Sequence, residues 1–120
     1  MKGRELRAEA RIAVKERGLL KNGALTTGVL VTGEAWFPCM VLDMSDSGFQ
    51  ILCSKPLAVG QVLDFKCALF PEKTLECKIE IRHVGDAGVG TRIIEIDKRG
   101  SGLVQLYLQE QYSLKLNNKS

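Results

Sequence analysis

Short runs in which apolar and polar residues alternate, separated by clusters of turn-forming residues, constrain this chain more than any other feature. In the clearest run, 74–84, positions 75, 77, 79 and 81 are apolar and charged residues lie between them. An antiparallel strand with one buried face has this period of two. Turn clusters such as 43–48 and 85–88 bound the runs. The expected strands are 26–32, 36–42, 49–53, 61–70, 74–84 and 89–96.

These strands and one C-terminal helix predict a mainly β fold, a six-stranded antiparallel β-barrel closed so that no strand edge is left exposed. The helix is expected over 103–114, where Leu103, Leu106 and Tyr107 fall at helical spacing and form a packing face. The 120 residues suffice for a single domain. We expect a barrel domain over 26–120, preceded by an arm over 1–25.

The expected arm is basic. Residues 1–21 hold seven Lys or Arg against three Glu, whereas the rest of the chain is nearly neutral. Such a segment is typical of a flexible arm that meets an anion, the alternative being a solvated basic tail. The N-terminus has no apolar leader and no run of about 18 apolar residues occurs. We therefore expect a cytoplasmic protein that does not insert into a membrane.

The cysteines are spaced widely, without any C-x-x-C pair, and each lies in an apolar stretch. This pattern favours buried structural thiols over a zinc site or disulfides. The one histidine, His83, excludes a site built from paired histidines. No nucleophile–base pair or phosphate-binding glycine loop is recognisable, so we expect neither an enzyme nor a bound metal or cofactor. The cysteines are Cys39, Cys53, Cys67 and Cys77.

Two clusters carry the chemistry of a candidate binding site. Arg7 and Arg11 are four residues apart and so point the same way in a helix or a strand. Guanidinium groups grip phosphate, bind the guanine edge and stack on bases. In the turn 43–48, Asp43 offers an acceptor to a purine edge, Ser45 adds a hydroxyl, and Gly48 lets a ligand approach the backbone. The alternative is a purely structural turn held by its own side chains.

Together the clusters resemble the PilZ domain family, whose members bind the bacterial second messenger cyclic diguanylate (c-di-GMP). The resemblance rests on R-x-x-x-R at 7–11 followed by D-x-S-x-x-G at 43–48, and it extends over 49–51, 56–61 and 88–93. It implies a six-stranded barrel with a C-terminal helix. It also implies that Arg7 and Arg11 contact guanine and phosphate, with Arg4 as an additional basic residue, while Asp43, Ser45 and Gly48 hold guanine.

The resemblance implies a c-di-GMP receptor that switches its contact with a partner protein, in motility, biofilm formation or a related process. The 32 positions from Arg11 to Asp43 exceed the family pattern, so we expect an extra turn or short helix within 15–25. Many relatives place an aromatic residue near the end of the fifth strand. Here Arg82 and His83 stand there, either as base-stacking groups or as outward-facing strand residues.

Two other functions remain open at this point. One is a PilZ-like adaptor that has lost nucleotide binding and acts through protein contacts. The other, a small barrel that binds RNA or single-stranded DNA, is disfavoured because only seven aromatic residues are present and most suit core positions. The sequence leaves the number of bound c-di-GMP molecules, the partner and the choice between monomer and homodimer open.

Overall fold

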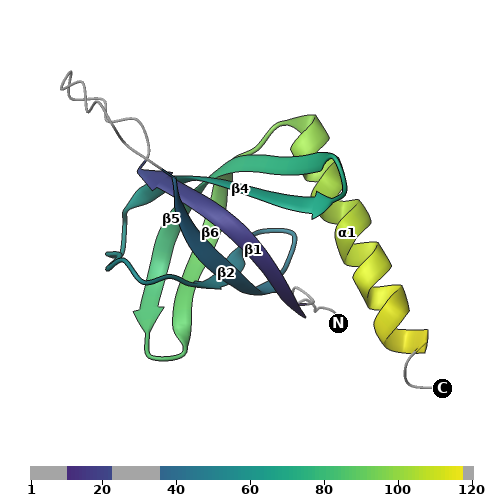
Figure 1. The fold of residues 1–120 in the computed structure, drawn as a ribbon, viewed down its shortest axis with the longest axis horizontal. Coiled ribbons are helices and arrows are strands. Elements are labelled where there is room, and N and C mark those ends of the chain that lie inside the picture. Colours follow the sequence, from purple (N-terminus) through teal and green to yellow (C-terminus); the bar gives the residue numbers. More distant parts are fainter. Residues whose placement is uncertain (1–10, 23–35, 118–120) are drawn as a thin grey trace, which may run out of the picture.

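The computed structural model describes residues 11–22 and 36–117. In these two ranges, six antiparallel strands close into a barrel in the order β1-β2-β3-β6-β5-β4, with β4 pairing onto β1. A single helix, α1, lies at one side of the barrel (Figure 1). The predicted six-stranded barrel with a C-terminal helix is therefore confirmed. The strands are β1 (Ile12–Asn22), β2 (Phe37–Met44), β3 (Phe49–Leu52), β4 (Val62–Phe70), β5 (Lys73–Gly85) and β6 (Gly88–Glu95).

The first strand lies earlier in the chain than the sequence analysis predicted. β1 falls within 1–25, the range expected for the arm, and the extra turn or helix expected in 15–25 is wrong for the described residues up to Asn22. The strand predicted at 26–32 lies outside the described residues. β1 pairs with β2 on one side and with β4 on the other, so it is a full member of the barrel.

The inward faces of the strands form one apolar core. The predicted alternation in β5 is confirmed, since Leu75, Ile79 and Ile81 have no exposed surface. The rings of Phe49 and Phe65 stack inside the barrel, with centroids 4.7 Å apart. Burying side chains of this size stabilises the fold by about 1.5–3 kcal/mol each. The core thus fixes which face of every strand is turned to solvent.

Helix α1 (Lys98–Asn117) begins earlier than predicted because Asp97 caps it. The Asp97 carboxylate accepts a hydrogen bond from the backbone N–H of Gly100 at 2.7 Å. This bond satisfies one of the amide groups that a helix leaves unpaired in its first turn. Within residues 11–22 and 36–117, no helix combines the length and apolar character that crossing a bilayer requires.

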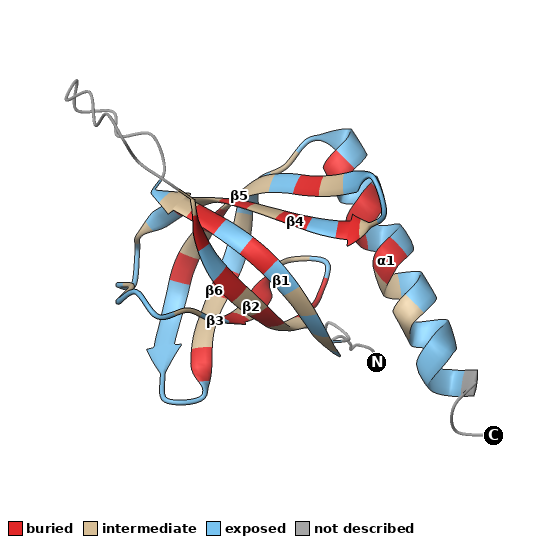
Figure 2. Ribbon diagram, in the orientation of Figure 1, coloured by how far each residue is buried: buried red, intermediate tan, exposed pale blue. Residues whose placement is uncertain are grey.

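The helix packs on the barrel through Leu103, Val104 and Tyr107, which are buried. The predicted packing face is right for Leu103 and Tyr107 and wrong for Leu106, which is 47% exposed. Figure 2 shows the buried positions in the first half of α1 and exposed positions along its second half. The Tyr107 hydroxyl donates to the carboxylate of Glu16 on β1 at 2.5 Å. Burial, reinforced by Glu16, raises the pKa of Tyr107.

All four cysteines are free. Cys39 and Cys67 are buried as predicted, while Cys53 and Cys77 are half-buried. Burial raises the pKa of the Cys39, Cys67 and Cys77 thiols to about 12. In the part of the chain that the structure describes, no group of three or more His, Cys, Asp or Glu side chains is arranged to hold a metal ion.

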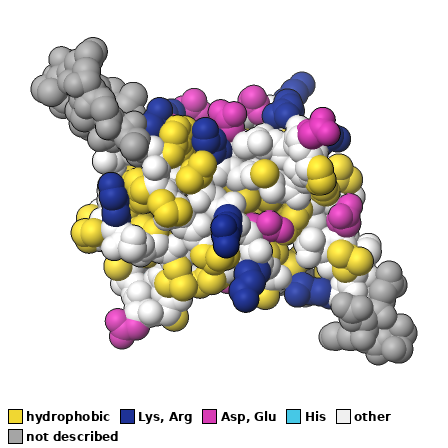
Figure 3. All heavy atoms as spheres, in the orientation of Figure 1, with side chains coloured by type: hydrophobic (Ala, Val, Ile, Leu, Met, Phe, Trp, Pro, Cys, Tyr) yellow, Lys and Arg dark blue, Asp and Glu magenta, His cyan; other side chains and the backbone are white. Residues whose placement is uncertain are grey.

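The surface mixes charged and apolar groups. On the face drawn in Figure 3, lysine, arginine and acidic side chains are interspersed with hydrophobic ones. Large hydrophobic side chains also stay exposed along the second half of α1, where Tyr112, Leu114 and Leu116 are each about half exposed.

Candidate functional site

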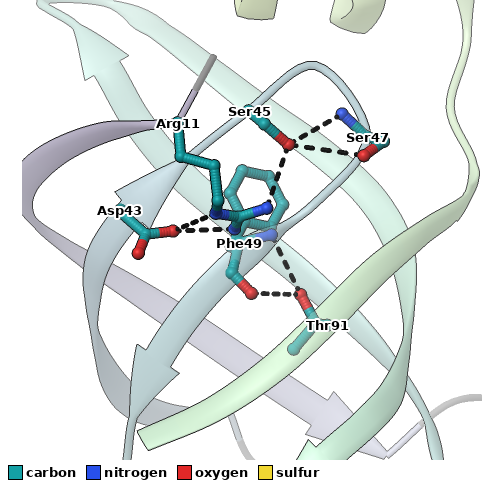
Figure 4. A network of polar contacts seen from close by, with 6 residues as sticks. All are labelled: Arg11, Asp43, Ser45, Ser47, Phe49 and Thr91. Atoms are coloured by element: carbon teal, nitrogen blue, oxygen red, sulfur yellow. Dashed lines mark hydrogen bonds and ion pairs between the residues drawn. The ribbon is translucent and has the colours of Figure 1, made fainter. Parts of the chain in front are cut away.

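Arg11 lies on the turn that follows β2. The first residues of β1 pair with the last residues of β2, so that Ala13 lies opposite Asp43. Arg11 Nε donates to Asp43 Oδ1 at 2.8 Å, and Arg11 Nη2 lies 2.7 Å from the same oxygen. Arg11 Nη1 donates to Ser45 Oγ at 3.3 Å. Three residues predicted for the site therefore meet at one place, with the guanidinium lying between the carboxylate and the hydroxyl (Figure 4).

The turn between β2 and β3 is held by its own polar groups. The backbone N–H of Ser45 donates to the carbonyl of Gly48 at 3.0 Å. Ser45 Oγ accepts the backbone N–H of Ser47 at 3.3 Å, and the two hydroxyls lie 3.3 Å apart. Serine side chains bond nearby backbone in this way in many turns. The structural reading of the turn is therefore correct, and it leaves Asp43 half-exposed at the edge.

Residues of β6 form hydrogen bonds with the turn and with the start of β3. Thr91 Oγ1 donates to the carbonyl of Phe49 at 3.0 Å and accepts the Phe49 N–H at 3.3 Å. The N–H of Ile93 donates to the carbonyl of Ser47 at 2.7 Å. Thr91 and Ser47 were missed by the sequence analysis, because no local pattern reveals that β6 passes behind this turn.

Gly48 is required by this close packing. A Cβ placed on Gly48 would lie 2.0 Å from the Thr91 carbonyl oxygen, which is far inside any real contact. The glycines with positive φ in the described residues are Gly60 and Gly88, so Gly48 is not needed for a left-handed conformation. The lack of a side chain at Gly48 thus lets β6 pack against the turn. The expectation that Gly48 lets a ligand approach the backbone stays a prediction.

Two other predicted residues, Arg82 and His83, lie on β5, apart from this cluster. Arg82 and His83 are exposed near the end of β5, and Arg82 Nη1 lies 3.7 Å from a Glu80 carboxylate oxygen. His83 pairs with Gly90 on β6. Arg4 and Arg7 lie outside the described residues.

A cavity of about 370 Å³ lies at the other end of β1, lined among others by Lys21, Trp36 and Asp64. The ammonium groups of Lys21 and Lys66 lie over the Trp36 ring, at 4.9 and 4.2 Å from its centroid. An 11-residue strand is about 33 Å long. Trp36 is therefore remote from Asp43.

The Arg11–Asp43 pair is open to solvent. The Arg11 and Asp43 side chains are 40% and 31% exposed. Ion pairs with this exposure are worth only about 0–1 kcal/mol. A ligand that offers both an anion and hydrogen-bond donors can therefore separate the pair at little cost. Ser45, by contrast, has no exposed surface.

Comparison with known proteins identifies the fold. The family model described as "PilZ domain" matches residues 5–110, most of the chain. The chain belongs to the PilZ domain family. The match includes the D-x-S-x-x-G turn and the residue range of the R-x-x-x-R motif. None of the curated proteins matches the chain.

Solved structures agree with the PilZ fold. Bacillus subtilis MotI/DgrA, described as an inhibitor of motility, superposes with a TM-score of 0.69 at 13% identity over 94% of this chain and 55% of that chain. Escherichia coli YcgR, solved in complex with c-di-GMP, superposes at 0.64 and 11% over 94% of this chain and 50% of that chain. This PilZ chain thus spans about half the length of either protein.

A third structure has nearly the same extent as this chain. The PilZ domain of CeSA from a cellulose-synthesising bacterium superposes with a TM-score of 0.59 at 11% identity, covering 88% of this chain and 98% of that chain. At these identities, the structural likenesses establish the fold.

Proposed function

We propose that this PilZ domain is a c-di-GMP receptor that binds the dinucleotide between its R-x-x-x-R arm and the D-x-S-x-x-G turn. The observation that carries the proposal is the contact of Arg11 with both Asp43 and Ser45. It supports the proposal because the second arginine of the motif reaches the turn despite the 32 positions between Arg11 and Asp43. The family match and the c-di-GMP complex of YcgR support the choice of ligand.

The chemistry of the cluster suits a guanine nucleotide. A carboxylate such as Asp43 accepts hydrogen bonds from the N1–H and N2–H groups of guanine. A guanidinium such as that of Arg11 binds phosphate through paired donors or takes the O6/N7 edge of guanine. Arg7 and Arg4 are proposed to add positive charge toward the two phosphates. Gly48 is proposed to act by letting the turn lie against β6.

Binding is proposed to begin with a rearrangement of Arg11. Arg11 occupies the acceptors on Asp43 and Ser45. Ser45 is fully buried and its hydroxyl accepts from Arg11, so a ligand is proposed to reach the hydroxyl only after Arg11 has moved. The ligand phosphate offers Arg11 a stronger partner than the exposed pair does. The moved arm then changes the surface that a partner protein meets.

Calorimetric titration of c-di-GMP into the wild-type protein and Arg11→Ala tests the proposal. Loss of a charged hydrogen bond costs about 1.5–3 kcal/mol, so we expect affinity to fall about tenfold or more. Arg17→Ala is the matched control, since Arg17 is an exposed arginine on β1, the strand that begins directly after Arg11. Equal affinities of wild type and Arg11→Ala would remove Arg11 from the site.

An adaptor that no longer binds nucleotide is the second candidate. Two observations favour it: Arg11 is already paired within the protein, and Arg82 and His83 stand where many relatives have an aromatic residue. The absence of any heat change with millimolar c-di-GMP would select the adaptor, and saturable binding would reject it.

A further inference from the structure

Asp43 belongs to a row of residues that crosses the outer surface of the barrel. Asp43 on β2 pairs with Gln50 on β3, Gln50 pairs with Gly90 on β6, and Gly90 pairs with His83 on β5. Directly opposed residues of antiparallel strands have their side chains on the same face. Neighbouring strands are about 4.8 Å apart, so the row from Asp43 to His83 spans about 14 Å.

Two bulges place the ends of this row on the outside. The pairing of β2 with β3 shifts between Val41 and Asp43, and the pairing of β5 with β6 shifts between Ile81 and His83. Val41 and Ile81 have no exposed surface. Without the shifts, residues two positions further along each strand would also face inward. The bulges therefore turn Asp43 and His83 toward solvent at the same level of the barrel, as bulges near binding sites often do.

The middle of the row is flat because β6 carries glycines there. A Cβ on Gly88 would meet Gln50 Nε2 at 2.9 Å, and a Cβ on Gly90 would meet Gln50 Oε1 at 3.5 Å and His83 Cβ at 3.5 Å. The amide of Gln50 therefore lies over the bare backbone of β6. The bare backbone at Gly88 and Gly90 therefore forms a floor on which the Gln50 amide lies, and Asp43 is two strands away on β2.

We propose that Gln50 is a further ligand contact and that Gly90 keeps the floor open for a guanine base. This inference rests on the proposed function and adds residues to it. A base whose donors bind Asp43 lies beside Gln50, since the two residues are direct cross-strand neighbours. The amide N–H groups of Gln50 then donate to O6 or N7 of the same base, which are acceptors. His83 closes the far end of the floor.

Titration of c-di-GMP into Gln50→Ala tests the contact. Loss of one hydrogen bond of about 1 kcal/mol predicts affinity about fivefold weaker than that of wild type. Gln105→Ala is the matched control, because Gln105 is exposed on α1 and distant from the row in the fold. We expect its affinity to equal that of wild type. Unchanged affinity in Gln50→Ala would overturn the role of Gln50.

Gly90→Val tests the floor separately. The Cβ at this position meets only ordinary van der Waals contacts, and valine suits a strand, so we expect the variant to fold. Its methyl groups would stand on the floor and weaken binding about tenfold or more. Wild-type affinity in Gly90→Val would contradict the inference while leaving the proposed function intact. Failure of wild type itself to bind c-di-GMP would overturn both.

Discussion

Arg11 and Asp43 meet in two contacts of 2.8 and 2.7 Å although 32 positions separate them in the chain. The reason is the antiparallel pairing of β1 with β2, which places the end of β2 beside the start of β1. Residues 15–22, where an extra turn or short helix was expected, belong to β1 instead. The length of the connection therefore does not separate the arginine from the turn.

Because this pair is exposed, its role in binding is separable from its role in stability. We expect Asp43→Asn to change the free energy of unfolding by less than about 1 kcal/mol. We expect its c-di-GMP affinity to fall about tenfold or more, since the carboxylate is the proposed acceptor for guanine. Asp64→Asn, which removes an ion pair of similar exposure with Lys78, should leave affinity unchanged. A large stability loss in Asp43→Asn alone would contradict this division.

Thr91 is predicted to stabilise the turn through its hydroxyl. Thr91→Val keeps the shape but leaves the N–H and carbonyl of Phe49 without this partner in a buried setting. We expect the free energy of unfolding to fall by about 1–3 kcal/mol in urea titrations. Thr91→Ser, which keeps the hydroxyl, should recover most of the loss. Wild-type stability in Thr91→Val would contradict the role of the hydroxyl.

Gly48→Ala and Gly102→Ala should change stability in opposite directions. A Cβ at 48 collides with the Thr91 carbonyl, so we expect destabilisation by more than about 2 kcal/mol or failure to fold. A Cβ at 102 meets no atom within 4 Å, and alanine is the better helix former by about 1 kcal/mol. Thermal unfolding of both variants checks this. A tolerated alanine at 48 would contradict the packing of the turn on β6.

The sequence predicts five strands well because their period of two is regular. β1 was missed because its inward positions include Glu16 and Gly18, which are not apolar. Glu16 is satisfied by Tyr107, and Gly18 accommodates the Phe65 ring, where an added Cβ would lie 2.9 Å from Cε1. Both partners are distant in the chain. The intervening charged residues are good helix formers, so the local sequence does not favour a strand.

The residues of the candidate site likewise fall into those that local sequence predicts and those that it does not. Asp43, Ser45 and Arg11 were predicted from local motifs and residue chemistry, and the structure brings them together. Thr91 and Gln50 act through cross-strand neighbours, which depend on register. Register is set by bulges such as that between Val41 and Asp43, and a single sequence does not display them.

Alkaline pH should destabilise the protein through its buried thiols. Folding raises the pKa of Cys39, Cys67 and Cys77 from 9.0 to about 12, so the unfolded chain releases these protons first. Their contribution to stability is complete below pH 9 and is lost as pH rises toward 12. We expect the free energy of unfolding to fall by more than about 2 kcal/mol between pH 8 and pH 10.5. A flat profile in urea titrations over this range would contradict the burial of these thiols.

The central claim, that c-di-GMP binds at Arg11 and the turn after β2, is tested most directly by amide NMR spectra recorded with and without the dinucleotide. We predict saturable shifts concentrated at Ala13 and at residues 43–50, with the amides around Lys21 and Trp36 at the far end of β1 unchanged. Spectra that stay identical at millimolar c-di-GMP, or shifts confined to the cavity beside Trp36, would contradict the account.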